Sequence, residues 1–169
     1  MRRFFTWCLL AISMTYTAQS DSPPPAAKSI KVFSSNRHFY AFSSLKEKKT
    51  YVFSAMDKQK ALWDIPGYHP VLFLSDDGQY LVVGYPGGNL LNETVKASDL
   101  FLCFFHSGQF VRGVHISDIF SDLNHIPQST SGRAWGNYFG FDERNHFILL
   151  LFDGKRITFD ANTGQLINR

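Results

Sequence analysis

Three polar turns along this chain are each followed by the same pattern of residues, and this repeat limits the fold more than any other feature. The turns begin at Ser34, Ser75 and Asp142. After each turn of four residues come one polar residue, an aromatic residue and an apolar run. Short apolar runs bounded by turn formers are typical of buried strands, and Asp-Gly between two such runs is a strong hairpin signal. The repeat therefore predicts three β-hairpins.

A second turn follows each hairpin at a variable distance. Ser107-Gly108-Gln109 closely matches Thr163-Gly164-Gln165, and Gln59-Lys60-Ala61 is a looser copy. Each unit then has two hairpins, or four strands, which is the composition of a propeller blade. The predicted fold class is all-β, with antiparallel four-stranded repeats. The repeats run from Ile30 to Asp64, from Pro70 to Ile116 and from Trp135 to Arg169.

The longer spacing of the later repeats is taken up by two inserts, Pro86–Ser98 and Ser117–Gly132. Ser117 is a residue type that caps helices, with Ile119, Phe120 and Leu123 on one face of the turn that follows. The second insert is therefore predicted to begin with a short helix and to continue as an exposed loop.

At these residues the chain resembles the blades of β-propeller proteins. "FLSDDGQYLVVG" is similar to a hairpin of WD40-like blades, and "ITFDANTGQLI" is similar to the closing hairpin of quinoprotein-type blades. The resemblance implies a partial or small propeller-like meander, with a β-sandwich as the alternative. Ordinary propellers close with four to eight blades, so three units need further copies of the chain to complete a ring. No cofactor is assigned, because a full ring is needed to enclose the quinone.

The first twenty residues have the features of a secretory signal peptide. Arg2 and Arg3 precede an apolar stretch, and small residues stand before Asp21. We therefore expect a signal peptide at 1–20, a Pro-rich tether at 21–29 and one β-repeat domain at 30–169. The protein is expected to be exported, to the periplasm or the outside of the cell, with no membrane span in the mature chain.

Charge and cysteine content exclude some classes of partner and fold. Without Arg2 and Arg3 the chain keeps 15 Lys and Arg against 14 Asp and Glu, which gives a net charge of +1. This balance does not predict nucleic-acid binding. Cys103 is the single cysteine after residue 20, so no internal disulfide is expected, and its apolar neighbours predict a buried thiol.

The sequence shows no pattern typical of a catalytic or metal site. The six histidines lack the spacing of zinc sites, and His38 and His146 occupy equivalent places in two repeats where the third has Gln79. The carboxylates of Asp76-Asp77 and Asp142-Glu143 are expected on exposed turns, where water screens them and leaves their pKa values unshifted. We assign no catalytic residue and no metal ligand.

Aromatic residues beside predicted strand ends are the better functional candidates. We expect ligand contacts from the loops Trp63–Pro70 and Tyr85–Asn92 on one edge of the sheet, while packing between repeats is the alternative for the tryptophans. The leading hypothesis is an exported, non-enzymatic binding or scaffold module with a protein or glycan partner. The alternatives are a carbohydrate-binding subunit that completes a propeller as a homo-oligomer, and a secreted hydrolase. The candidate ligand-binding residues are Trp63, Tyr68, His69, Tyr85 and Trp135.

Overall fold

The computed structural model describes residues 27–168, and these residues form three consecutive four-stranded antiparallel sheets with a smaller sheet beside them. The first sheet contains β1 (Ile30–Phe33), β2 (Phe39–Ser44), β3 (Lys49–Ser54) and β4 (Trp63–Pro66). The middle sheet contains β5 (Leu72–Leu74), β6 (Tyr80–Gly84), β8 (Leu100–His106) and β9 (Gln109–His115). The third contains β12 (Gly136–Phe141), β13 (His146–Leu151), β14 (Arg156–Asp160) and β15 (Gln165–Asn168).

The predicted fold class, all-β with antiparallel four-stranded repeats, is confirmed. In each sheet the strands lie in chain order. The first and last residues of each predicted repeat lie within two residues of the bounds of the observed sheet. In the described part of the chain none of the sheets closes into a barrel. The predicted signal peptide and residues 21–26 of the predicted tether lie outside the described residues.

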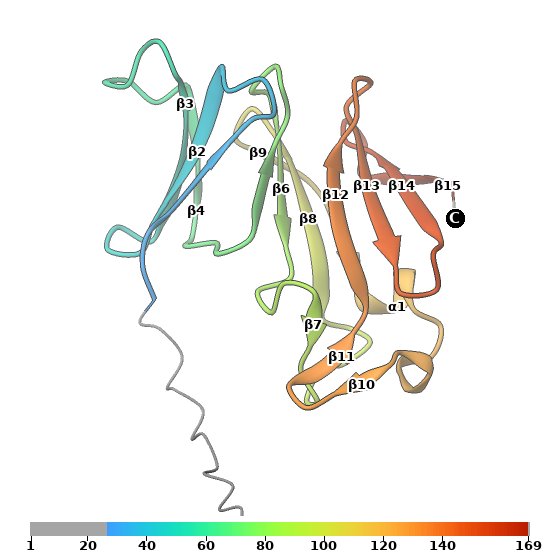
Figure 1. Ribbon diagram of the computed structural model, residues 1–169. Helices are drawn as coiled ribbons and strands as arrows, with labels where there is room; N and C mark the ends of the chain where they lie inside the picture. The colour runs from blue at the N-terminus through green and yellow to red at the C-terminus, as the bar shows by residue number, and fades with distance from the viewer. Residues whose placement is uncertain (1–26, 169) are drawn as a thin grey trace, which may run out of the picture.

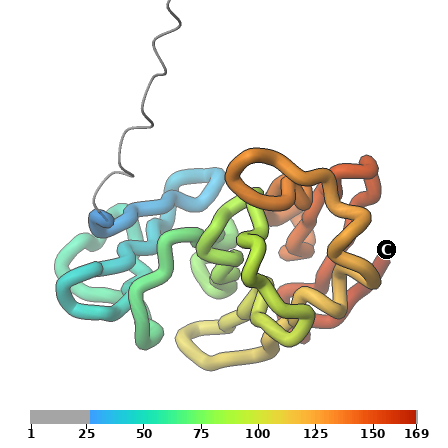
Figure 2. Tube along the Cα trace, turned by 90° about the horizontal axis from the view of Figure 1, so that it is seen from below, coloured from blue at the N-terminus to red at the C-terminus, as the bar shows by residue number. Residues whose placement is uncertain are grey.

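The three sheets lie side by side in chain order, with the middle sheet between the other two (Figures 1 and 2). Two apolar clusters hold the stack together. The smaller cluster joins the first and middle sheets through residues such as Val52, Ile65 and Leu81. The larger cluster joins the middle and third sheets and includes Phe104 and Phe147. Side chains on alternate faces of each strand allow the middle sheet to pack on both sides.

The two inserts pair with each other, which the sequence did not predict. β7 (Leu90–Leu91) from the first insert pairs with β11 (Gly132–Ala134), and β11 pairs with β10 (Gln128–Ser129). This small sheet lies at the end of the molecule opposite the hairpin turns at 34–38, 75–79 and 142–145 (Figure 1). We call the two ends the insert end and the turn end.

The predicted helix is present but starts earlier than expected. α1 (Ile116–Ile119) is capped by His115 rather than by Ser117, because the Asp118 carboxylate accepts the His115 backbone N–H at 2.8 Å. The 3₁₀-helix η1 (Leu123–His125) follows as a separate turn, and the Asp122 side chain caps it.

Candidate binding site at the turn end

The three predicted turns share one backbone geometry. Their fourth residues, Arg37, Gly78 and Asn145, all have positive φ, and each donates its N–H to the carbonyl of the first residue of the turn at 2.9–3.1 Å. Asn and Gly tolerate this left-handed conformation at least cost. The repeat seen in the sequence is therefore a repeat of turn structure.

Side-chain hydrogen bonds fix the first two turns in the same way. Ser34 and Ser75 are buried, and their hydroxyls accept the N–H of Phe39 at 3.1 Å and of Tyr80 at 2.9 Å. Each hydroxyl also donates to the side chain two residues on: Ser34 to Asn36 at 2.8 Å, and Ser75 to Asp77 at 2.5 Å. This pattern needs a small hydroxyl followed by Asn or Asp, which explains both sequences.

The third turn is one residue shorter than the sequence alignment predicted. Phe33 faces Tyr40 across the first turn, but Phe141 faces Phe147 across the third. His146 thus takes the place of Phe39 and Tyr80 at the start of β13, and it pairs with Asp160. The predicted equivalence of His38 and His146 is wrong. His38 is exposed on its turn, whereas His146 is partly buried.

Hydrogen bonds join the three turns in series across the sheets. Asn36 donates its backbone N–H to the Asp76 carboxylate at 2.8 Å and its side-chain amide to the Asp76 carbonyl at 2.9 Å. The Asn145 amide donates to the Asp77 carboxylate at 3.0 Å. Adjacent acids of the middle turn therefore hold one neighbouring turn each.

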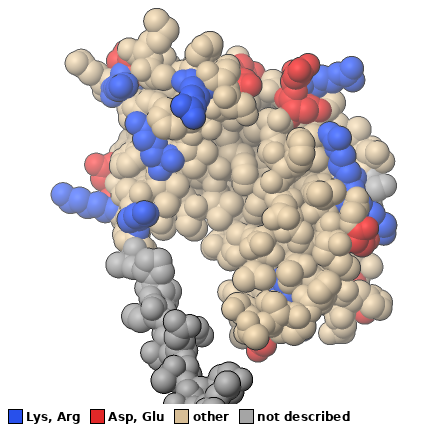
Figure 3. All heavy atoms as spheres, in the orientation of Figure 1, with Lys and Arg blue, Asp and Glu red and all other residues tan. Residues whose placement is uncertain are grey.

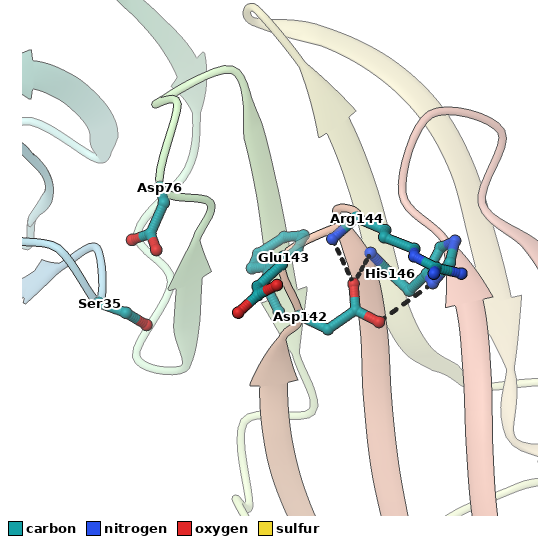
Figure 4. A pocket seen from close by; sticks show the side chains of 7 residues that line it. Ser35, Asp76, Asp142, Glu143, Arg144 and His146 are labelled. Carbon is teal, nitrogen blue, oxygen red and sulfur yellow. Dashed lines mark hydrogen bonds and ion pairs between the residues drawn. The ribbon is translucent and has the colours of Figure 1, made fainter.

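A pocket of about 520 Å³ opens where the three turns meet. Ser35 and Asp76 lie on one side of it, and Asp142, Glu143 and their neighbours lie on the other (Figure 4). The residues that line it are Ser35, Asp76, Phe141, Asp142, Glu143, Arg144 and His146. On the face shown in Figure 3, charged side chains lie along the upper rim, which is the turn end, and along both sides, while the centre is mostly uncharged.

Hydrogen bonds favour the ionised form of two carboxylates at this end. Burial opposes ionisation of Asp142, but donors from the His146 and Arg144 backbone and the His146 ring outweigh burial and lower the Asp142 pKa. Burial likewise opposes ionisation of Asp77, and donors from Ser75, Gln79 and Asn145 lower its pKa. The prediction of unshifted pKa values is wrong for both groups. Both remain anionic at neutral pH.

The predicted ligand-binding residues do not share one edge. Trp63 begins β4 at the turn end, and its indole N–H donates to the Gly78 carbonyl at 3.0 Å. Tyr68 and His69 follow β4 at the other end, where the Tyr68 hydroxyl donates to the Lys28 carbonyl at 2.9 Å. The segment Trp63–Pro66, expected as a loop, is a strand, because it pairs with β3.

The remaining candidates pack within the protein. Trp135 is 0% exposed, and its indole N–H donates to the Gly88 carbonyl at 2.8 Å. The expectation of an exposed ring at Trp135 is therefore corrected, and packing between repeats accounts for the residue. Tyr85 lies against the larger cluster, with its ring centroid 6.3 Å from that of Phe101. His69 faces the Pro66 carbonyl at 2.9 Å through its ring nitrogen.

The remaining ionisable groups and helices offer no further candidate site in the described part of the chain. Within residues 27–168, no three His, Cys, Asp or Glu side chains converge in a way that would hold a metal ion. Cys103 is partly buried, and burial raises its thiol pKa, so the thiolate nucleophile is disfavoured at neutral pH. None of the helices described at 27–168 is both long and apolar enough to cross a membrane.

Comparison with known proteins found no matching protein family and no matching curated relative. Five of the residues that line the pocket belong to the three predicted turns, whereas Phe141 and His146 lie in the strands that flank the third turn. The signal that could have identified them is the turn repeat, because equivalent turns of stacked sheets lie at the same end.

Proposed function

We propose that the protein is an exported, non-enzymatic binding module that holds a cationic segment of a protein partner at the turn end. The observation that carries this proposal is the pocket bounded by three turns, which is lined by the carboxylates of Asp76, Asp142 and Glu143 together with the Phe141 ring. Carboxylates beside an aromatic ring suit a Lys or Arg side chain, which pairs its charge with the acids and its stem with the ring.

The rigidity of the turns supports a binding role. Asn36 and Asn145 tie the outer turns to the middle one, so the pocket walls are fixed before a ligand arrives. A preformed site spends little free energy on ordering its own loops, and this favours affinity. The Glu143 carboxylate lies on the side facing Ser35 and Asp76 and is exposed, so it is available to a ligand (Figure 4).

We further propose that the three sheets are arranged like propeller blades. The first strand of the middle sheet, β5, contacts both β1 and β12, the first strands of its neighbours. First strands that meet at a common axis, with turns at one end, are consistent with the resemblance of the hairpin sequences to blades. The turn end then corresponds to one face of an incomplete ring.

The test is a charge reversal in the pocket with a matched control. We expect Glu143→Lys to weaken binding of a lysine-rich peptide by about tenfold or more, measured by calorimetry at low salt. Glu93→Lys makes the same change of net charge at the insert end and should leave the affinity within about twofold. Equal losses in both variants, or no peptide binding by the unchanged protein, would contradict the proposal.

One observation favours a second candidate, a hydrolase. The His146 ring nitrogen lies 3.1 Å from the Asp142 carboxylate in the same pocket, an arrangement that can orient a histidine as a general base for water. If this candidate is correct, His146→Gln abolishes hydrolysis of an activated ester such as p-nitrophenyl acetate while the fold is kept. The glycan alternative has less support, because Trp135 is buried and Trp63 is held by Gly78.

A further inference from the structure

Each sheet presents one equivalent row of apolar side chains, which we call the leading row. The row consists of three residues paired across the first three strands of a sheet at the turn end. The cross-strand register defines the rows as Phe33, Tyr40 and Phe53 in the first sheet, Leu74, Leu81 and Phe105 in the middle sheet, and Phe141, Phe147 and Phe159 in the third.

Within the chain, a leading row is covered by the sheet that precedes it. Leu74 and Leu81 of the middle sheet lie in the smaller cluster with Ala41 and Val52 of the first. In the third sheet, Phe147 packs on Phe104 of the middle sheet, with ring centroids 6.1 Å apart. In both contacts, the face of one sheet that lies opposite its own leading row covers the leading row of the next sheet along the chain.

The leading row of the first sheet has no preceding sheet among residues 27–168. Its rings pack on each other, with centroids 5.6 Å apart for Phe33 and Tyr40 and 5.0 Å apart for Tyr40 and Phe53. The Lys31 ammonium lies 3.8 Å from the Tyr40 ring centroid. Phe33 remains 49% exposed, while Tyr40 is 6% exposed and Phe53 is partly buried. The residues equivalent to Phe33 in the other sheets, Leu74 and Phe141, are buried or partly buried.

The opposite face of the third sheet is uncovered only in part, because Ile148 on this face is 1% exposed. Leu150 alternates with the buried Leu149 and Leu151, so it points away from the middle sheet, and it is 42% exposed. Phe139 lies in a bulge of β12 and is 71% exposed, with the Arg156 guanidinium 5.9 Å from its ring centroid. The first and middle sheets each use the equivalent face to cover the leading row of the sheet that follows.

We propose that two copies of the chain assemble head to tail, so that the third sheet of each copy covers the leading row of the first sheet of the other. Two copies supply six sheets. Propellers usually have four to eight blades, and six is the one multiple of three in that range. A head-to-tail contact closes into a ring when its rotation permits. The ring form rests on the propeller-like arrangement proposed above, whereas the pairing of faces follows from the leading rows.

Light scattering on the purified protein, expressed with its natural N-terminus, measures the native mass and so tests the proposal. We expect a dimer, and we expect Phe33→Asp and Leu150→Asp each to raise the dissociation constant by at least about tenfold, because each places a charge in an apolar contact. Phe110→Asp is the matched control. Phe110 is 61% exposed on β9 of the middle sheet, and its substitution should leave the mass unchanged.

Mixing the two variants distinguishes a head-to-tail contact from a symmetric one. Phe33→Asp damages one face and Leu150→Asp the other, so an equimolar mixture has one intact contact per pair of chains. We expect the mixture to form dimers where neither variant alone does. A circular dichroism spectrum matching the unchanged protein shows that each variant is folded.

A monomer at every concentration, a dimer insensitive to both substitutions, an open polymer, or a mixture that stays monomeric would each overturn the proposal. Binding of the lysine-rich peptide is measured on the same samples. Glu143 belongs to neither contact face, so peptide binding and dimerisation can fail independently.

Discussion

The backbone N–H of Tyr85 donates to the hydroxyl oxygen of Tyr138 at 2.8 Å, across 53 residues of sequence. Tyr85 follows β6 of the middle sheet, and Tyr138 lies in β12, the first strand of the third. The Tyr138 ring packs in the larger cluster beside Phe73, Phe101 and Trp135. Burial raises the pKa of the Tyr138 hydroxyl far above its usual range. One hydroxyl therefore satisfies a backbone group at the boundary between two sheets.

Replacing Tyr138 with Phe should destabilise the protein by about 1–3 kcal/mol, because the Tyr85 N–H loses its acceptor while the apolar packing is kept. The free energy of unfolding in urea measures the change. Tyr68→Phe is the control, since the Tyr68 hydroxyl bonds near the surface, and it should cost less than about 0.5 kcal/mol. Equal losses in both variants would show that the hydrogen bond to Tyr138 contributes no more to the free energy of unfolding than the one made by Tyr68.

Gly78→Ala should destabilise the protein more than Gly154→Ala. Both glycines have positive φ, at 70° and 83°, so both substitutions carry the same backbone cost of about 1–2 kcal/mol. A Cβ on Gly78 would lie 2.5 Å from the Phe39 ring, whereas a Cβ on Gly154 would have open space. We expect about 1–3 kcal/mol of additional loss at Gly78 from overpacking, measured as a difference in urea midpoints. Equal midpoints would mean that the Phe39 ring moves away freely.

The protein should lose stability in acid partly through Asp77. Its pKa in the folded state lies below the usual 3.8, so the unfolded chain binds the proton more readily. The stabilisation from Asp77 is present above about pH 4 and is lost as the pH falls through the folded-state pKa.

Unfolding curves of Asp77→Asn between pH 2 and pH 7 check this dependence. The variant should be less stable than the unchanged protein at pH 7, and the difference should shrink toward pH 2. Glu93→Gln, at the insert end, is the matched carboxylate-to-amide control. A difference at Asp77 that is the same at every pH would show that the lost contacts do not depend on charge.

Trp63 and Trp135, which were both candidate ligand-binding residues, should respond differently to truncation. Trp135→Ala leaves a cavity in the larger cluster and an unpaired Gly88 carbonyl, at an expected cost of about 3–5 kcal/mol. Trp63→Ala should cost about 1–3 kcal/mol, because Trp63 is partly exposed at the edge of the smaller cluster. Thermal unfolding measures both, and a larger loss at Trp63 would contradict the assigned burial.

The parts of the fold that were predictable depend on local sequence. Ser75 to Gly78 and the flanking apolar runs specify their hairpin without help from the rest of the chain, so the sheet boundaries were predicted closely. Trp135 was predicted either to contact a ligand or to pack between repeats, and the sequence could not decide between the two, because the burial depends on Gly88 and on the pairing of two inserts far apart in sequence. The shorter third turn was missed because His146 and Phe147 both fit the expected pattern, and cross-strand register decides between them.

The division of the core into two clusters has a consequence for how the protein opens. The first sheet is held by the smaller cluster, which has six buried residues, whereas the larger cluster has seventeen. A segment with fewer buried contacts reaches its open state at a lower free energy than the whole molecule. Backbone amides of β2 and β3 should therefore exchange with deuterium through local opening, while those of β8 and β13 should exchange only through global unfolding. The protein then behaves as a stable two-sheet body that can release its N-terminal sheet.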